Sequence, residues 1–116
     1  MSIEEVLKEI HYTPGVRGSF VIGRDGSVKG AYLSPDQSQK ETAATISSMA
    51  KEIEESAGKL ESGKAMVTYL FGKNGNLFFV ASESLILAIL TERHANLGIV
   101  RHTLRDGFKR LLRGKE

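Results

Sequence analysis

The stretch AMVTYLFGKNGNLFFVA, residues 65–81, contains two strand-like runs on either side of a sharp turn. Asn74-Gly75 between them is the strongest short sequence signal for a β-hairpin, because both residues tolerate the backbone angles of a tight turn. Alternate side chains of a strand point to opposite faces, and in the first run both sets are largely apolar: Met66, Thr68 and Leu70 in one, Val67, Tyr69 and Phe71 in the other. The stretch therefore predicts a hairpin whose first strand is mostly buried on both faces.

A second hairpin is predicted earlier in the chain, over residues 16–33. Its Asp25-Gly26 pair favours a primed turn, which requires positive φ. VIGRDGSV (residues 21–28) and LFGKNGNL (residues 70–77) share one pattern of apolar, glycine and polar positions. Two interpretations stay open. The two hairpins are related by an internal duplication, or similar turns simply require similar residues.

Helices are predicted around these hairpins. Ser2 and Glu5 form a capping-box pattern before a short amphipathic helix that Pro14-Gly15 ends. A long helix begins at Ser34 or at Ser38, and Gly58 suits its C-terminal cap. Its apolar face contains Ile46, Met49, Ala50, Ile53 and Ala57. The last helix follows Asn96, a favourable N-cap residue.

The apolar run from Leu85 to Leu90 predicts a strand covered on both faces. The order of elements becomes α-β-β-α-β-β-β-α, and the 116 residues suit a single domain, 1–116. The predicted fold class is α+β, with a five-stranded antiparallel sheet and helices on its faces.

Composition excludes several kinds of chemistry. The chain has no cysteine, so it forms no disulfide and no thiolate metal site. His11, His94 and His102 lack the spacing of metal ligands, and no carboxylate pair is marked as buried. We therefore expect no catalytic residue, no metal and no cofactor. The start MSIEEVLKEI carries acidic residues among apolar ones, which favours a cytoplasmic protein without membrane insertion.

The segment GKLESGK, Gly58–Lys64, fits the glycine-rich pattern of phosphate-binding loops. A working loop of this kind joins a strand to a helix, whereas here a helix precedes and a strand follows. The next residue is Ala65, which offers no hydroxyl for magnesium. We interpret the segment as a polar turn and expect no nucleotide-binding residue.

The last helix carries a basic stripe, in which cations recur every fourth residue: Arg101, Arg105, Lys109 and Arg113. Nucleic acid, anionic lipid or an acidic protein would suit such a stripe, and so would plain solvent. We favour a solvated face whose cations match the helix dipole. No strand offers an aromatic platform for RNA, so no nucleic-acid partner is predicted.

The strand over residues 65–71 contains no lysine, proline or inward charge that would protect it at a sheet edge. An unprotected apolar edge needs a partner, and a second copy related by a two-fold axis would join two sheets into one. The long helix also carries small residues, namely Ala43, Ala44, Thr45, Ser47 and Ser48. These either permit close approach of another surface or simply suit packing on the sheet.

PGVRGSFVIGRDG (residues 14–26) and ANLGIVRHTLRDGFKRLL (residues 95–112) resemble the first hairpin and last helix of the Roadblock family of dynein light-chain-like domains, especially its MglB-like members. The resemblance covers nearly the whole chain. It implies a profilin-like sandwich and a homodimer formed through the middle helix and the third strand. The implied dimer interface comprises Thr45, Met49, Glu52, Val67, Tyr69 and Phe71.

The resemblance also implies a function: a non-enzymatic regulator or scaffold of a small Ras-like GTPase, with stimulation of GTP hydrolysis as one form of regulation. The hypothetical GTPase contacts lie away from the core face of the long helix, at Lys40, Ala44, Ser47, Ser48 and Lys51. Arg17, Arg24 and Arg93 are available as an arginine finger, but no pattern selects one of them.

Two other functions stay open. One is a structural adaptor of a motor or membrane-associated complex, which would bind its partners independently of nucleotide. The other is a small-molecule sensor, which needs a cavity between helices and sheet. The large residues Phe78, Phe79 and Phe108 argue that this space is filled.

Overall fold

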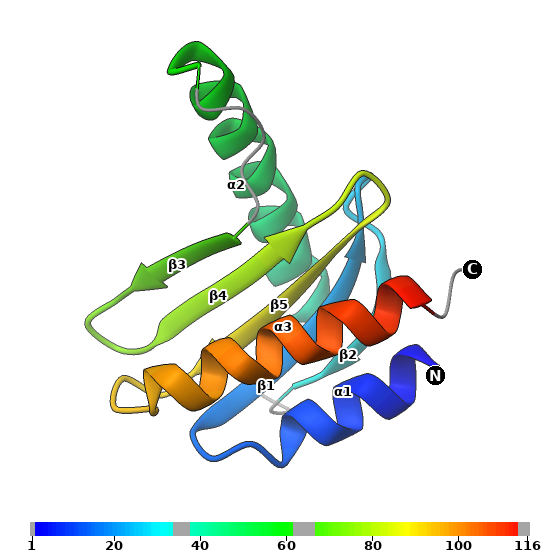
Figure 1. Cartoon of the computed structure of the whole chain (residues 1–116), viewed down its shortest axis with the longest axis vertical. Coiled ribbons are helices and arrows are strands. Elements are labelled where there is room, and N and C mark those ends of the chain that lie inside the picture. Colours follow the sequence, from blue (N-terminus) through cyan, green and yellow to red (C-terminus); the bar gives the residue numbers. More distant parts are fainter. Residues whose placement is uncertain (1, 34–37, 62–66, 114–116) are drawn as a thin grey trace.

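The computed structural model describes residues 2–33, 38–61 and 67–113. The elements follow in the predicted order (Figure 1). They are α1 (Ile3–His11), β1 (Val16–Gly23), β2 (Val28–Tyr32), α2 (Gln39–Lys59), β3 (Val67–Phe71), β4 (Asn76–Ala81), β5 (Leu85–Thr91) and α3 (Leu97–Arg113). The α+β class is therefore confirmed.

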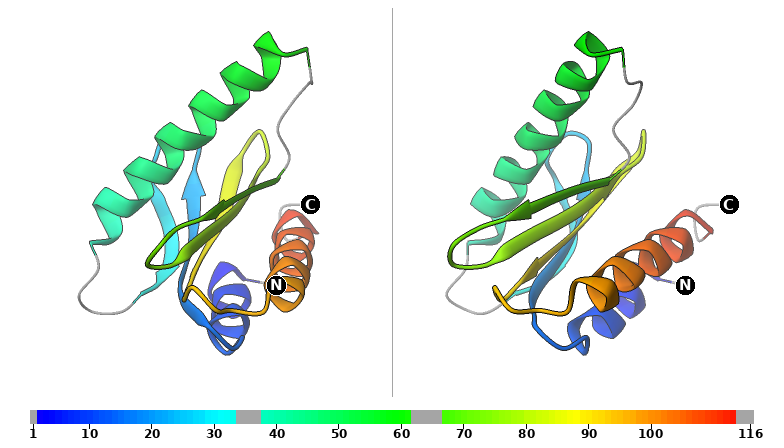
Figure 2. Two further views of the ribbon diagram at one scale, coloured as in Figure 1. Left: turned by 90° about the vertical axis from the view of Figure 1, so that its left-hand side faces the viewer. Right: turned by 60° about the vertical axis from the view of Figure 1, so that its left-hand side comes forward.

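The five strands form one antiparallel sheet in the order β2-β1-β5-β4-β3. β5 lies at its centre, and six of its seven residues are buried, as its continuous apolar run predicts. α1 and α3 lie side by side on one face of the sheet, whereas α2 crosses the other face (Figures 1 and 2). Helices therefore cover both faces, and β2 and β3 form the two edges.

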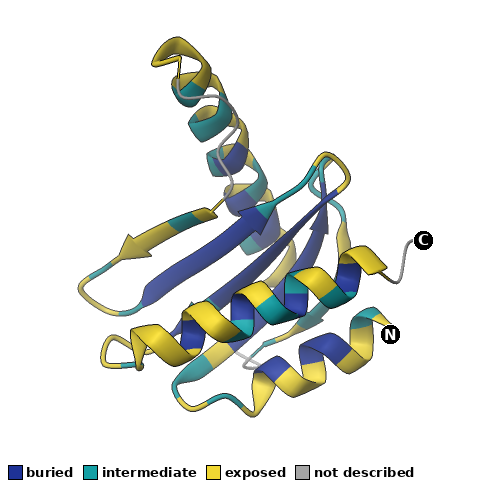
Figure 3. Cartoon of the chain, in the orientation of Figure 1, coloured by how far each residue is buried: buried dark blue, intermediate teal, exposed yellow. Residues whose placement is uncertain are grey.

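The core has two layers, because successive strand residues point to opposite faces of the sheet. Along the sheet, β4 is mostly buried and β3 is mostly exposed (Figure 3). Phe78 is buried on the side of α1 and α3, and its neighbour Phe79 is buried on the side of α2. The first layer receives three buried residues from each of its two helices: Val6, Leu7, Ile10, Val100, Leu104 and Leu111. The α2 layer receives only Ala43, Ile46 and Ala50 as fully buried side chains, so α2 covers its face less completely.

Three helix starts are fixed by the predicted capping residues. The backbone N–H of Glu5 donates to Ser2 Oγ at 3.2 Å, and that of Ile99 donates to Asn96 Oδ1 at 3.0 Å. α2 uses the later of its two predicted starts, since the backbone N–H of Glu41 donates to Ser38 Oγ at 3.4 Å. The earlier start, at residues 34–37, lies outside the described residues.

The predicted end of α2 at Gly58 is wrong. The helix continues to Lys59, and Glu61 adopts the left-handed backbone with φ 57°. The Leu60 N–H bonds to the Ser56 carbonyl, and the Glu61 N–H bonds to that of Gly58, both at 3.1 Å. Gly58 is exposed with open space around it, so the helix tolerates this glycine inside its last turn.

Both predicted hairpins form, but the first turn has a different type. Gly26 has positive φ (+87°), whereas Asp25 does not. The Gly26 N–H bonds to the Gly23 carbonyl at 2.9 Å, which describes a three-residue loop with a bulge rather than a two-residue primed turn. The Asp25 carboxylate instead accepts hydrogen bonds from the hydroxyl of Ser27 at 2.6 Å and from its backbone N–H at 3.0 Å.

Replacing Ser27 with alanine is expected to raise the pKa of Asp25 toward its ordinary value. The Ser27 hydroxyl is the main cause that holds this pKa low in the folded chain, followed by the Ser27 backbone N–H. A lowered folded pKa stabilises the fold above the unfolded pKa of about 3.9, and this contribution disappears as pH falls through the folded pKa. The Asp25 carboxyl titration, followed by carbon-detected NMR in both proteins, measures the shift; equal values would contradict this role of Ser27.

Candidate functional site

β3 is an edge strand, and most of its side chains are exposed to solvent. Val67, Leu70 and Phe71 are 47%, 44% and 62% exposed. The prediction of a strand buried on both faces is therefore wrong for the single chain. Among the described strands, β4 alone pairs with β3, and α3 packs mainly on β4 and β5. The prediction of an unprotected apolar edge, however, agrees with the structure.

The side chains of β3 divide between the two faces of the sheet. The Tyr69 and Phe71 rings lie 5.4 and 5.9 Å from the Phe78 ring, on the face that carries α1 and α3. Leu70 lies opposite Leu77, which belongs to the core layer beneath α2. The predicted interface residues Val67, Tyr69 and Phe71 therefore share the α3 side, while Leu70 points to the α2 side.

α2 leaves part of its own face of the sheet uncovered. A groove of about 350 Å³ lies between α2 and the ends of β4 and β5. It is lined by Glu41, Thr42, Thr45, Ile46, Met49, Leu77 and Leu90. A second hollow of about 380 Å³ follows the same helix toward its C-terminal end, where α2 projects beyond the sheet (Figure 1). That hollow is lined by Glu52, Ile53, Ser56, Ala57 and Leu60.

The structure thus places the α2 part of the predicted dimer interface beside unfilled apolar space. Thr45 and Met49 line the first groove, and Glu52 lines the second hollow. Sequence reasoning missed Leu60, which is 76% exposed, and Leu70. Leu70 was detectable from the alternation of the strand, because it follows Thr68 on the face opposite Tyr69. Leu60 was not predicted as part of this surface, because the helix was expected to end before this residue.

The predicted GTPase contacts occupy another flank of α2. Lys40, Ala44, Ser48 and Lys51 are exposed, and Ser47 is partly buried. Ser47 lies beside the β1–β2 turn, since a Cβ on Gly26 would stand 3.8 Å from its Oγ. Ser47 therefore lies toward the β1–β2 side, whereas the groove lies toward the β3 side. None of the five predicted GTPase contacts is among the residues that line this groove.

Two of the three arginines available as a finger already have partners. Arg24 Nη2 donates to Glu54 Oε2 at 2.7 Å, and its Nη1 donates to the Ser82 carbonyl at 3.2 Å. These bonds connect the β1–β2 turn to α2 and to the β4–β5 loop. Arg17 donates to the Asn74 carbonyl at 3.0 Å. Arg93 is exposed, and its guanidinium has no hydrogen bond or ion pair within the described part of the chain, although its backbone carbonyl accepts from the Asn76 side-chain amide at 3.3 Å. Within that part, no cluster of three or more histidine and acidic residues is suited to a metal ion.

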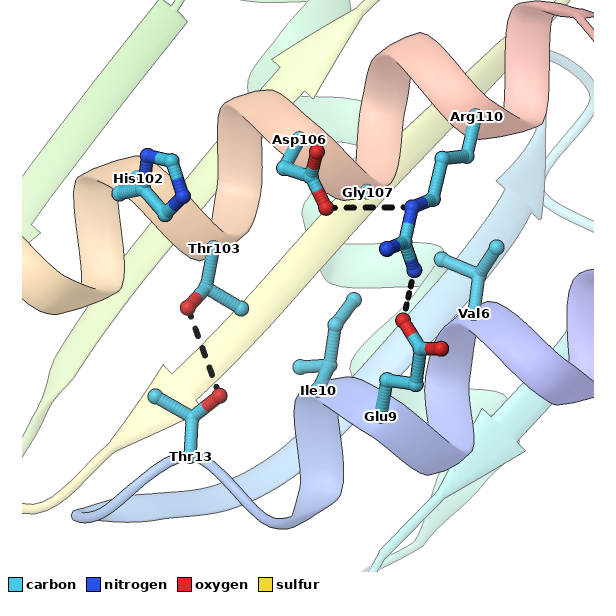
Figure 4. A pocket seen from close by; sticks show the side chains of 9 residues that line it. All are labelled: Val6, Glu9, Ile10, Thr13, His102, Thr103, Asp106, Gly107 and Arg110. Carbon is cyan, nitrogen blue, oxygen red and sulfur yellow. Dashed lines mark hydrogen bonds and ion pairs between the residues drawn. The ribbon is translucent and has the colours of Figure 1, made fainter.

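A smaller hollow between α1 and α3 is lined by one cation and two carboxylates (Figure 4). Arg110 pairs with Glu9 and, at 3.2 Å, with Asp106. The Thr13 and Thr103 hydroxyls are 3.4 Å apart and form a hydrogen bond across the hollow. These contacts join the two helices, so we interpret this region as structural.

The glycine-rich segment over residues 58–64 is only partly described. Gly58 and Lys59 belong to the last turn of α2, and Leu60 caps that helix. The remainder, residues 62–64, lies outside the described residues. Its described part is therefore a helix end, where the dipole repels anions.

Comparison with known proteins shows the family. Residues 2–91 match the model of the Roadblock/LC7 domain, so the chain belongs to this family. A protein of Methanocaldococcus jannaschii is 31% identical over 103 residues, which cover 89% of this chain and 90% of that protein.

Two solved structures share the fold. One is described as MglB with tetrameric arrangement (TM-score 0.87, 22% identity, 96% of this chain and 85% of that chain). The other is profilin II of Acanthamoeba castellanii (TM-score 0.67, 12% identity, 98% and 96%). The profilin-like fold and the MglB-like Roadblock architecture are therefore confirmed. Among the described helices, none combines the length and the apolar character needed to span a membrane.

Proposed function

We propose that this chain forms a homodimer through β3 and the adjacent side of α2. The observation that carries the proposal is the coincidence of two unpartnered surfaces, an exposed apolar strand edge and an apolar groove, on the same side of one molecule. Edge strands pair readily with another strand, and large exposed apolar patches mark interaction sites.

A two-fold axis beside β3 would satisfy both surfaces at once. The two β3 strands would pair in antiparallel fashion, and the two sheets would become continuous. The second α2 would then approach the groove beside Thr45 and Met49. Leu70, which is 44% exposed, would be buried between the two helices and the joined sheet. The assembly in the description of the MglB structure supports self-association of this fold.

We further propose that the dimer is a non-enzymatic regulator or scaffold of a small Ras-like GTPase. Family membership and the MglB-like fold support this role. The proposed contact surface is the outer flank of α2, where Lys40 and Lys51 are exposed and the small side chains of Ala44 and Ser48 permit close approach. Such a surface would act by holding the switch loops of the GTPase in place, because it offers no reactive group of its own.

The test measures binding of this chain to a small GTPase encoded in the same genome. The GTPase is used in its GDP form and in a transition-state-analogue form. We expect association that depends on the bound nucleotide, and a change in GTP turnover when the chain regulates hydrolysis. Lys51→Glu is expected to slow association severalfold and to weaken its salt dependence, since charges at the rim of an interface mainly affect the association rate.

Lys8→Glu is the matched control, because it makes the same charge reversal on exposed α1. Association rates from stopped-flow or surface plasmon resonance give the comparison. Negligible binding to every nucleotide form would contradict the proposal. Equal, tight binding to all forms would instead indicate the structural adaptor.

A further inference from the structure

Another unfilled region lies on the opposite face of the sheet from α2, between β3 and α3. It is a groove of about 290 Å³, lined by Val67, Tyr69, Val80, Arg101, Leu104, Arg105, Phe108 and Lys109. Its lining has two distinct parts. The floor and inner wall are apolar, and the outer wall carries three cations from one side of α3.

The charges of these three cations are not balanced. Within the described residues, Arg101, Arg105 and Lys109 form no ion pair with a carboxylate. Arg101 instead stands 5.8 Å from the centre of the Tyr69 ring, a cation–π distance. On the other flank of the same helix, Arg110 is paired with both Glu9 and Asp106. The contrast places uncompensated positive charge specifically beside the apolar groove.

A solvated basic stripe, the interpretation that the sequence favours, does not account for the apolar floor. Val67 is 47% and Tyr69 is 37% exposed, so the groove presents apolar surface to water directly beneath the cations. A ligand that matches it must bring carboxylates and apolar side chains together. Cations four residues apart on α3 are about 6 Å apart along its axis, which matches carboxylates one turn apart on a second helix.

We propose that this groove binds an acidic amphipathic helical segment of a partner protein, about two turns long. Its carboxylates pair with Arg101, Arg105 and Lys109, and its apolar side chains fill the space between Val67, Tyr69 and Phe108. The three cations of the outer wall all lie on α3 of one protomer, whereas Val67 and Tyr69 belong to β3, the strand through which the proposed dimer forms. The proposal does not rest on the GTPase.

The probe is a fluorescein-labelled peptide of twelve residues with glutamate on one side of its helix and leucine and phenylalanine on the other. Fluorescence anisotropy with the full chain is expected to show saturable binding that weakens as salt rises. A peptide of the same composition in scrambled order, and the same peptide with lysine in place of glutamate, are expected to bind at least about tenfold more weakly.

Arg105→Glu is expected to weaken binding of the acidic peptide by about tenfold or more, because it replaces an attractive charge with a repulsive one. Lys51→Glu reverses one charge on the other side of the sheet and is expected to leave peptide binding unchanged. Circular dichroism checks that both variants fold. The same pair of variants separates the two proposals, since Lys51→Glu should affect only the GTPase.

The proposal would be overturned if binding shows no saturation up to about 100 µM peptide. Such a result would mean a dissociation constant on the order of millimolar or weaker. Equal binding of the scrambled peptide would do the same, because it would show attraction by charge alone. Tighter binding to phosphatidylserine vesicles or to duplex DNA, with the same loss in Arg105→Glu, would assign the groove to a different class of partner and would also overturn it.

Discussion

Replacing Leu70 with aspartate is expected to convert the proposed dimer into a monomer. Leu70 is 44% exposed on the free edge strand and faces the side of the sheet that α2 leaves uncovered. A carboxylate buried there without a partner costs about 2 kcal/mol or more per copy. A two-fold interface contains the change twice, so dissociation becomes about a thousandfold more favourable.

Leu70→Asp is a cleaner test than Tyr69→Asp. The Tyr69 ring packs on Phe78 and lies beneath Arg101, so its replacement would also disturb the protomer. The matched control is Tyr12→Asp, since Tyr12 is 73% exposed at the C-terminal cap of α1. Analytical ultracentrifugation measures how strongly each of the two variants self-associates. A Leu70→Asp protein that associates as strongly as Tyr12→Asp would place the interface elsewhere.

Replacing Phe78 with alanine is expected to have the largest effect on stability. The Phe78 side chain is 1% exposed in the layer beneath α1 and α3, and its ring also supports Tyr69 and Phe71 from below. Truncation of a buried phenylalanine costs about 3–5 kcal/mol, and the free energy of unfolding of a domain is only about 5–15 kcal/mol. The change would also loosen the apolar edge strand on which both β3 surfaces depend.

Urea denaturation measures this loss, best in the Leu70→Asp background so that association does not contribute to the midpoint. Tyr12→Ala serves as the aromatic control and is expected to change the free energy of unfolding by no more than about 0.5 kcal/mol. A Phe78→Ala loss as small as that of the control would mean that Phe78 does not support the core as described.

The sequence was sufficient for the order and type of the elements, because local patterns determined them. Ser2, Ser38 and Asn96 each cap a helix as their residue types predict. The unbroken apolar run of β5 correctly indicated a central strand. The end of α2 was not predictable in this way, because Glu61 rather than a glycine adopts the left-handed backbone there.

The site was only partly predictable, for a physical reason. Apolar composition shows that a strand such as β3 favours burial, but it does not show whether its own chain or another chain supplies the cover. Residues 65–71 were therefore expected to be buried, although much of β3 is exposed in the protomer. Likewise, the basic stripe of α3 was visible in the sequence, whereas the apolar groove beside it requires β3 and α3 to be brought together.

Two of the three proposed surfaces meet at β3, because Val67 and Tyr69 belong to the edge strand and also line the α3 groove. The dimer surface comprises the β3 edge and the neighbouring side of α2, and the GTPase surface is the other flank of α2. The groove of α3 lies across the sheet from both α2 surfaces. A dimer with this arrangement would bind a GTPase and an acidic partner segment at the same time, which suits a scaffold. Only the dimer surface requires a second copy of the chain.

The molar mass of the purified chain, measured by light scattering during size-exclusion chromatography at micromolar concentration, tests the central claim most directly. The chain mass is 12.7 kDa, and pairing of two β3 edges predicts twice that value. A stable species at the mass of a single chain would leave the apolar edge permanently in water and would contradict the account.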